Sequence, residues 1–394
     1  MTGDQKERTN TVKITEVIPH VLIGKTAPYS TWASDFVDVR YSMVVEIRTD
    51  EGITGWGESV CHGRQPGGVS AAYINYTFKP LLIGKDPFDV EVLWENMFHT
   101  SRPFGGGGAV NAISGIDVAL WDIIGKALKK PIHQLIGGAF RTKVIPYATS
   151  FYRVEGRSYP EAYIEEAREL IADGFRAFKL KTGYGIRKDS EYIHAMREAI
   201  GPDMLLAADA NCAYDAPLTR QLLLEVEDAR LHFLEEPMKT DDLEGYKMLR
   251  NKTTTHLACG ENLFTKYDFR RWIVEGAVDI LQPDVCSAGG ITECKKIAAM
   301  AQAYAARVIP HVWGTGIGLA AALQLIAALP SNQLSSFAEE PMLEFDRSAH
   351  PFRDAVIHDK ITMEDGAVKV PMGPGIGVEV NEDAVREFEQ RLKQ

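Results

Sequence analysis

The chain has 394 residues, enough for two or three domains, and is 45% hydrophobic and 25% charged, as ordinary soluble globular proteins are. Its net charge of −11 argues against nucleic acid and anionic membranes as partners, but it leaves room for a small carboxylate substrate at a locally positive site. The five cysteines are scattered and form no CxxC pair, which argues against a disulfide framework and favours a reducing, cytoplasmic location.

The first part of the chain is predicted to be a small α+β domain, residues 1–140. Its first ten residues are polar and do not resemble a signal peptide. Alternating Val, Ile and Thr residues then predict an antiparallel meander with strands at 12–21, 35–49 and 53–60. Helical patterns follow at 68–79, 87–98 and 109–127. The glycine run Gly105–Gly108 lacks the Gly-Lys-Ser/Thr of a phosphate loop, so we interpret it as a hinge.

The pattern changes after residue 140 to short apolar runs that alternate with amphipathic stretches. Strands are predicted at 144–149, 175–181, 204–209, 231–235, 256–260, 278–282 and 307–311, and between 335 and 345. Helices are predicted at 158–172, 189–200, 240–250 and 291–305, and the apolar run 316–329, too short to cross a bilayer, is interpreted as a buried helix.

This alternation predicts an α/β fold, a parallel (β/α)₈ barrel over residues 141–355 whose last strand–helix unit is modified. The remaining segment, 356–394, contains glycine-rich turns and an amphipathic helix. We expect it to return to the N-terminal domain and complete it.

Two lysines stand two residues apart in the predicted strand 175–181. Successive strand residues point to opposite faces, so Lys179 and Lys181 share one face. Like charges repel, and each lysine is expected to lower the pKa of the other toward the range of roughly 7–8 that suits a base at neutral pH. The alternative is an exposed edge strand with solubilising lysines, and this stretch alone does not decide between them.

Polar residues end the following strands, each one strand–helix unit beyond the last. They are Asp209 and Asn211, Glu235 and Glu236, Glu261, Asp284, and His311. In such a barrel the C-terminal strand ends surround the active site, so these side chains are expected to converge. The carboxylates Asp209, Glu235 and Glu261 would supply hard oxygen ligands, which favours Mg²⁺. Periodicity does not decide whether Glu235 or Glu236 is the ligand.

Asp284 and His311 end neighbouring strands and suggest an acid/base dyad, because a carboxylate fixes the tautomer of an imidazole and raises its basicity. A lone histidine would more often be an ordinary core residue. A lysine, a His–Asp pair and a metal site between them suit removal of the α-proton of a carboxylic acid and stabilisation of the enediolate. A Schiff-base aldolase could also use Lys181, but it would need neither three acids nor a second lysine.

These motifs resemble the mandelate racemase branch of the enolase superfamily over almost the whole chain. The resemblance is carried by Lys179-x-Lys181, Asp209-Ala-Asn211, Glu235-Glu-Pro237, Gly260-Glu261-Asn262, Pro283-Asp284 with Gly289-Gly290, and His311, and in the capping domain by Gly55-Trp-Gly-Glu58 and Gly115-Ile-Asp117-x-Ala-Leu-Trp-Asp122.

The resemblance implies a role for each of these side chains. Lys181 is implied as one acid/base, with Lys179 lowering its pKa and contacting the substrate carboxylate. The implied Mg²⁺ ligands are Asp209, Glu235 and Glu261, and the implied opposing acid/base is His311 with Asp284. An eighth-strand glutamate is implied to hydrogen-bond the enediolate; Glu344 looks most like it, and Glu340 and Glu339 compete.

Three segments are similar to those of galactarolactone cycloisomerases, namely Val278–Asp284, Pro310–Gly316 and Glu340–Asp346. The resemblance implies an Mg²⁺-dependent enzyme that removes the α-proton of an acid sugar or its lactone and then completes a β-elimination, either cycloisomerisation or dehydration. Racemisation or epimerisation is the alternative, and a non-catalytic relative is a third. Substrate recognition is expected from Asn211, Tyr29, His62, Arg64 and Trp313. The resemblance also implies a homo-oligomer.

Overall fold

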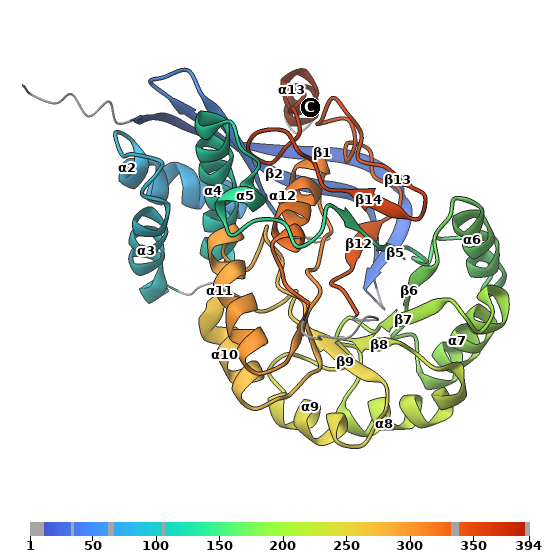
Figure 1. The fold of residues 1–394 in the computed structure, drawn as a ribbon. Helices are drawn as coiled ribbons and strands as arrows, with labels where there is room; N and C mark the ends of the chain where they lie inside the picture. Colours follow the sequence, from blue (N-terminus) through green and yellow to red (C-terminus); the bar gives the residue numbers. More distant parts are fainter. Residues whose placement is uncertain (1–11, 33–34, 62–66, 105–106, 332–338, 391–394) are drawn as a thin grey trace, which may run out of the picture.

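The computed structural model describes residues 12–32, 35–61, 67–104, 107–331 and 339–390. A curled parallel sheet with helices outside it forms one part, and an antiparallel sheet with its own helices covers one side of that part (Figure 1). The two parts are called the barrel and the capping domain below.

The capping domain begins with a three-stranded antiparallel sheet in the order β1-β2-β3. Its strands are β1 (Ile14–Trp32), β2 (Asp35–Thr49) and β3 (Thr54–Ser59). The first strand is much longer than the predicted 12–21, because it stays paired with β2 to its end. Register shifts, one of them between Lys25 and Tyr29, absorb the irregular sequence on the way.

Helices follow this sheet in the chain, and several of them pack against it. They are α1 (Gly68–Tyr73), the π-helix η1 (Ile74–Phe78), α2 (Lys79–Leu82), α3 (Val90–Ser101), the 3₁₀ turn η2 (Arg102–Phe104), α4 (Gly107–Leu128) and α5 (Ile132–Leu135). The predicted helix 68–79 therefore consists of three consecutive pieces. Within the described residues α4 alone is long and apolar enough to cross a membrane, but 83% of its apolar window is buried, as in a core helix.

Two glycines of the Gly55-Trp-Gly-Glu58 motif let β3 lie directly against α4. A Cβ on Gly57 would come within 2.0 Å of the Gly115 carbonyl oxygen, and one on Gly55 within 2.2 Å of the Ala119 carbonyl oxygen. Alanine at either position would collide with rigid helix backbone. The spacing of these glycines is thus a requirement of close packing between strand and helix.

The barrel is one parallel sheet of eight strands in the order β11-β10-β9-β8-β7-β6-β5-β12. The strands are β5 (Pro146–Thr149), β6 (Ala177–Lys181), β7 (Leu205–Asp209), β8 (Phe233–Glu235), β9 (His256–Cys259), β10 (Ile280–Leu281), β11 (Arg307–Val308) and β12 (Leu343–Asp346). The helices that follow the strands are α6 (Glu161–Ala172), α7 (Ile186–Ile200), α8 (Ala216–Glu225) with the 3₁₀ turn η3 (Glu227–Ala229), α9 (Leu243–Arg250), α10 (Thr265–Val274), α11 (Gly290–Ala303) and α12 (Gly316–Ala327). The predicted α/β barrel class is confirmed.

The last unit departs from the strand–helix repeat, as predicted. After β12 the chain forms a short hairpin, β13 (Met363–Glu364) and β14 (Ala367–Lys369), and β14 pairs with β4 (Lys143–Val144). The closing helix α13 (Glu382–Gln390) lies against β1 of the capping domain (Figure 1). There Glu389 Oε2 is 3.0 Å from Nδ1 of His20.

The candidate active site

One apolar layer fills the interior of the barrel and supports the site. It contains Tyr147, Ala177, Ala207, Phe233, Ala258, Ile280, Ile309 and Met342, one residue from each strand or its immediate extension. Two residues further along each strand stand Thr149, Lys179, Asp209, Glu235, Gly260, Gln282, His311 and Glu344. Side chains two apart on a strand face the same way, so these residues form a second, polar layer on top of the apolar one.

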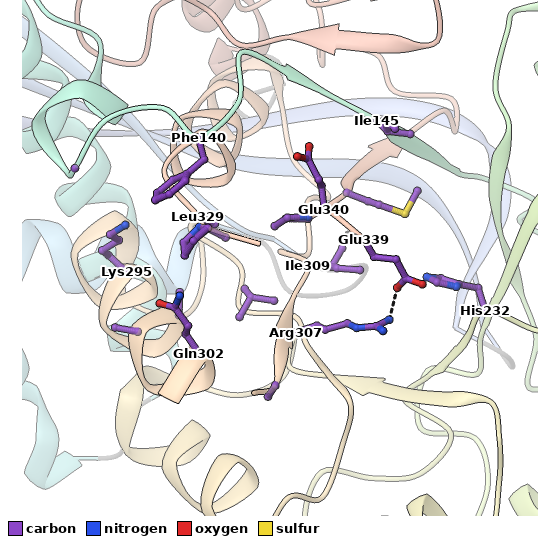
Figure 2. Close-up of a pocket in the computed structure, with 18 of the residues that line it drawn as sticks. Phe140, Ile145, His232, Lys295, Gln302, Arg307, Ile309, Leu329, Glu339 and Glu340 are labelled. Atoms are coloured by element: carbon purple, nitrogen blue, oxygen red, sulfur yellow. Dashed lines mark ion pairs between the residues drawn. The ribbon is translucent and has the colours of Figure 1, made fainter. Parts of the chain in front are cut away.

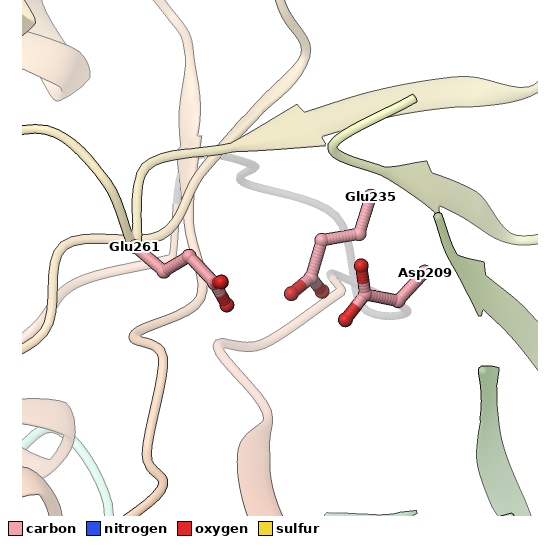
Figure 3. Close-up of side chains that lie close together, drawn as sticks. All are labelled: Asp209, Glu235 and Glu261. Atoms are coloured by element: carbon pink, nitrogen blue, oxygen red, sulfur yellow. The ribbon is translucent and has the colours of Figure 1, made fainter. Parts of the chain in front are cut away.

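Three carboxylates converge at the C-terminal ends of neighbouring strands (Figure 3). Strand register places Lys181 beside Asp209, and Asp209 beside Glu235. Glu261 follows β9, and one oxygen of each of these three acids lies within 4.8 Å of the other two. All three residues are buried. Such a group of rigidly held oxygen atoms fits a divalent metal ion.

Burial and neighbouring carboxylates act most clearly on Glu235. Burial, together with Asp209 and Glu344, raises the pKa of Glu235 to about 8, although Lys179 opposes the shift. Gln282 helps to hold Glu235, since its Nε2 donates to Glu235 Oε2 at 2.6 Å. Buried carboxylates that repel one another in this way are stabilised by a bound cation.

Lys179 belongs to the floor of the site. Its ammonium is 2.8 Å from Glu235 Oε1 and 2.6 Å from Glu344 Oε1, and the residue has no exposed surface. Burial lowers the pKa of Lys179, but the carboxylates Glu235 and Glu344 more than offset this, and its pKa lies well above the ordinary value. In this enclosed position Lys179 contacts carboxylates of the protein.

Lys181 lies one layer higher, at the end of β6. Its Nζ is 2.5 Å from Asp209 Oδ2 and 3.1 Å from Asn211 Oδ1. Burial and the charge of Lys179 lower the pKa of Lys181, but Asp209 raises it more, so the pKa lies above its ordinary value. Lys179 thus lowers the pKa of Lys181 as predicted, but the carboxylates raise it more, so the net shift is opposite to the predicted one.

His311 lies at the other end of the triad. Its Nε2 is 3.1 Å from Glu261 Oε2, and its Nδ1 is 2.6 Å from Asp284 Oδ2. Burial lowers the pKa of His311, but Glu261 and further carboxylates raise it to about 10 overall. The predicted His–Asp pair is thus in contact, and the triad separates it from Lys181.

The competing glutamates have different surroundings. Glu236 has φ of 36°, and its carboxylate is not part of the triad; it accepts from Cys212 Sγ at 3.2 Å and Asn262 Nδ2 at 2.7 Å. Glu344 accepts from Thr149 Oγ1 at 2.6 Å in the floor of the site. Glu340 instead pairs with Arg141 at 3.1 Å.

A cavity lies at the opposite end of the barrel from the triad. Its volume is about 790 Å³, and its lining includes Ile145, Leu205, His232 and Arg307, which precede or begin strands (Figure 2). Glu340 lines this cavity, which places it away from the carboxylates that end the strands. The carboxylate triad and this cavity are thus at different ends of the sheet.

The predicted substrate-recognition residues fall into three groups. Asn211 lies in the site between Lys181 and Glu261. Its Nδ2 is 3.4 Å from Glu261 Oε1, and its Oδ1 accepts from Lys181. Trp313 and Tyr29 lie beside the site in an aromatic cluster, described below, and Tyr29 is only 5% exposed. His62 and Arg64 lie outside the described residues.

Sequence reasoning missed Gln282 and Tyr152. Gln282 ends its strand one residue before Pro283, but a neutral amide does not stand out in a search for charged strand ends. Tyr152 follows the first barrel strand, which ends in the uncharged residues Thr149 and Ser150. The Lys181 Nζ is 5.4 Å from the centre of the Tyr152 ring. A search of every strand end for aromatic residues would have found it.

Comparisons with known proteins agree with this geometry. The model of the mandelate racemase / muconate lactonizing enzyme N-terminal domain matches residues 13–137, and the enolase C-terminal domain-like model matches residues 162–384. A D-galactarolactone cycloisomerase of Agrobacterium fabrum is 39% identical over 96% of this chain and 99% of its own. A D-galactonate dehydratase of Pectobacterium atrosepticum is 37% identical over 88% of this chain and 90% of its own. The crystal structure of the 3,6-anhydro-D-galactonate cycloisomerase of Zobellia galactanivorans, also 39% identical, superposes with a TM-score of 0.85 over 95% of this chain and 99% of that one.

Proposed function

The chain belongs to the mandelate racemase / muconate lactonizing enzyme family of the enolase superfamily, and from this premise we propose that it catalyses β-elimination on an acid sugar. The proposed substrate is a hydroxy-carboxylate, either an acid-sugar lactone or an anhydro acid, and the favoured reaction is cycloisomerisation. One observation carries the proposal: Lys181 and His311 contact opposite ends of a buried carboxylate triad.

We assign Asp209, Glu235 and Glu261 as ligands of Mg²⁺. The donor set consists of carboxylate oxygens, without the sulfur or imidazole ligands that favour softer metals. When bound, the ion supplies positive charge that stabilises negative charge on the substrate carboxylate.

The proton transfers are assigned to the two groups at the ends of the triad. Lys181 Nζ is held by Asp209 and Asn211, so its position on one side of the substrate is defined. His311 is held by Asp284 through Nδ1, which leaves Nε2 directed toward Glu261 and the centre of the site. One of these groups removes the α-proton, and the other returns a proton to the product or delivers it to the leaving oxygen. Lys181 is our candidate for the first step, which it performs as the neutral amine; a cation held by Asp209 would offset the charge of that carboxylate and so lower the raised pKa of Lys181.

The floor of the site supports the same chemistry. Glu344 is fixed by Thr149 Oγ1 at 2.6 Å and by the backbone N–H of Val312 at 3.0 Å. Lys179 joins Glu344 to Glu235 from below. The acids are therefore held rigidly before substrate arrives, which is the arrangement that electrostatic stabilisation of a developing charge requires.

Elimination is favoured because the similar enzymes are cycloisomerases and dehydratases. Two relatives that are 39% identical carry names of cycloisomerases, of D-galactarolactone and of 3,6-anhydro-D-galactonate, and one that is 37% identical is a D-galactonate dehydratase. Dehydration is thus the second form of the same β-elimination. A non-catalytic role is not favoured, since each residue needed for the chemistry is present and the named relatives are enzymes.

The test is incubation of the full-length protein with Mg²⁺ and each of these three compounds in D₂O, followed by NMR and mass spectrometry. Cycloisomerisation gives an isomer of the substrate that has gained deuterium from the solvent, and dehydration gives a product that has lost water. Recovery of deuterated but otherwise unchanged substrate would overturn elimination.

Racemisation or epimerisation is the alternative that this last outcome would support. It is chemically reasonable, because acid/base groups at both ends of the triad can remove a proton from one face and return it on the other. Lys181→Ala and His311→Asn then separate the roles. The variant that still exchanges the α-proton with D₂O, but no longer forms product, has lost the group that completes the reaction.

A further inference from the structure

A buried arginine of the capping domain reaches the edge of the active site. Arg40 lies in β2 and is 2% exposed. Its guanidinium lies over the Trp313 ring, 3.8 Å from the ring centre, and its Nη2 donates to Asp346 Oδ2 at 2.6 Å. Arg40 therefore connects the capping domain to the end of β12 and to the segment that follows His311.

Trp313 in turn holds a tyrosine beside the catalytic lysine. Its indole Nε1 donates to the Tyr152 hydroxyl at 2.9 Å, and the Lys181 Nζ lies 5.4 Å from the centre of the Tyr152 ring. Tyr29, which accepts from Arg40 Nη1 at 3.3 Å, packs edge-on against the same ring with 5.7 Å between ring centres. Tyr152 is thus fixed on two sides by residues that Arg40 contacts.

We propose that Arg40 is a positioning residue for Lys181, acting through Trp313 and Tyr152. Lysine has a long flexible side chain, and Asp209 and Asn211 hold its ammonium at the tip of that chain. The ring of Tyr152 further restrains the Lys181 side chain, and the Arg40–Trp313 stack determines the position of that ring. The proposal rests on the proposed function only where it assigns proton transfer to Lys181.

The chain offers a matched control for Arg40. Arg353 donates to the same oxygen of Asp346 at 2.5 Å, so Arg40→Met and Arg353→Met each remove one of two guanidinium partners from one buried carboxylate. Arg40 stacks on the Trp313 ring, whereas Arg353 donates to the carbonyl and hydroxyl oxygens of Ser348. If Arg40 acted only through its ion pair with Asp346, Arg40→Met and Arg353→Met should change the Trp313 environment and the turnover to a similar extent.

The first readout does not depend on turnover. The full-length protein is labelled with 5-fluorotryptophan, and Trp313→Phe assigns the Trp313 signal among the six tryptophans in the ¹⁹F NMR spectrum. We expect Arg40→Met to shift the Trp313 resonance and Arg353→Met to leave it in place. An unmoved resonance in folded Arg40→Met overturns the proposal. If Arg40→Met does not fold, Arg40→Lys keeps the charge beside Asp346, loses the planar stack and is expected to give the same shift.

The second readout is turnover of the acid sugar that the wild type converts. Arg40→Met is expected to lower kcat by between about tenfold and about a hundredfold, the range that follows from small misplacement of a reacting group, with little change in KM. The Arg40→Met/Tyr152→Phe double variant should be no slower than the slower single variant, because both act on the same element. Multiplicative losses would contradict a shared path. If the wild type converts no acid sugar, the proposed function fails, whereas an unmoved Trp313 resonance overturns this proposal whatever the turnover.

Discussion

Glu58 ties the capping domain to the barrel segment that follows His311, and its removal should have a calculable cost. The buried carboxylate accepts from Ser42 Oγ and Thr315 Oγ1, each at 2.6 Å. It also accepts from the backbone N–H groups of Thr315 at 2.9 Å and Gly318 at 2.8 Å. Thr315 is the N-cap of α12, so one side chain of the capping domain satisfies the start of a barrel helix.

Glu58→Ala leaves these two buried backbone N–H groups without their acceptor. Each such group costs about 1–3 kcal/mol, so we expect the free energy of unfolding to fall by about 4 kcal/mol. With an unfolding entropy of about 2.1 cal/mol/K per residue over the whole chain, the thermal midpoint should fall by about 5 °C.

Glu58→Gln is the matched control. The carboxylate oxygen Oε2 lies 3.1 Å from the Thr315 nitrogen and 2.8 Å from the Gly318 nitrogen, so an amide oxygen in its place still accepts both, and the variant loses only the second acceptor of the Thr315 N–H, Oε1 at 2.9 Å. The hydroxyl of Ser42 can rotate to accept from the new amide N–H. We therefore expect a loss below about 1.5 kcal/mol.

Differential scanning calorimetry at pH 7 compares the three proteins. An alanine variant with the midpoint of the wild type would refute the claim that Glu58 holds the start of α12. A glutamine variant that loses as much as the alanine variant would show that the carboxylate charge matters, and not the number of acceptors.

Three further predictions concern other parts of the chain. Burial raises the pKa of Asp117 to about 7, so its protonated form favours folding below about pH 4, and this stabilisation is lost as the pH rises through 7. Asp117→Asn should therefore exceed the wild type in stability at pH 8, by up to about 4 kcal/mol, but not at pH 4; a pH-independent difference in calorimetry would contradict this. Gly57→Ala places a Cβ 2.0 Å from a backbone oxygen and should sharply reduce the yield of folded protein, whereas Gly68→Ala meets open space and should be neutral or stabilising by up to about 1 kcal/mol. Millimolar Mg²⁺ should raise the thermal midpoint of the wild type more than that of Glu261→Gln, since a ligand of the folded state stabilises it; an equal response would argue against the triad as the binding site.

The barrel and the convergence of its acids could be predicted from local patterns. Alternation along strands and the repeat of strand and helix define an eight-stranded parallel sheet. In such a sheet residues that end successive strands must meet, which is why Asp209, Glu235 and Glu261 could be grouped although they lie far apart in the chain. The glycines of the β3 motif can also be recognised locally in the sequence. What requires them, however, is the close packing of α4 against β3.

The depth of each side chain within the barrel was decided by the tertiary structure alone. Lys179 and Lys181 share a face of one strand, yet Lys179 lies enclosed in the floor and Lys181 lies one layer above it. The depth of each side chain along the barrel axis depends on how its strand is staggered against the neighbouring strands. The alternation of side chains along one strand carries no information about this stagger. The sign of the lysine pKa shifts follows from the same cause, since it depends on which carboxylate lies closest.

Contacts between distant segments could not be predicted from the sequence either. The choice of Glu235 over Glu236 depends on a backbone turn at φ 36°, and the choice of Glu344 over Glu340 depends on which end of the barrel each occupies. Local sequence determined which chemical groups stand at the strand ends. The packing of the capping domain on the barrel determined how those groups are held, because Arg40 meets Trp313 across 273 positions of chain, a separation at which no periodic pattern carries information.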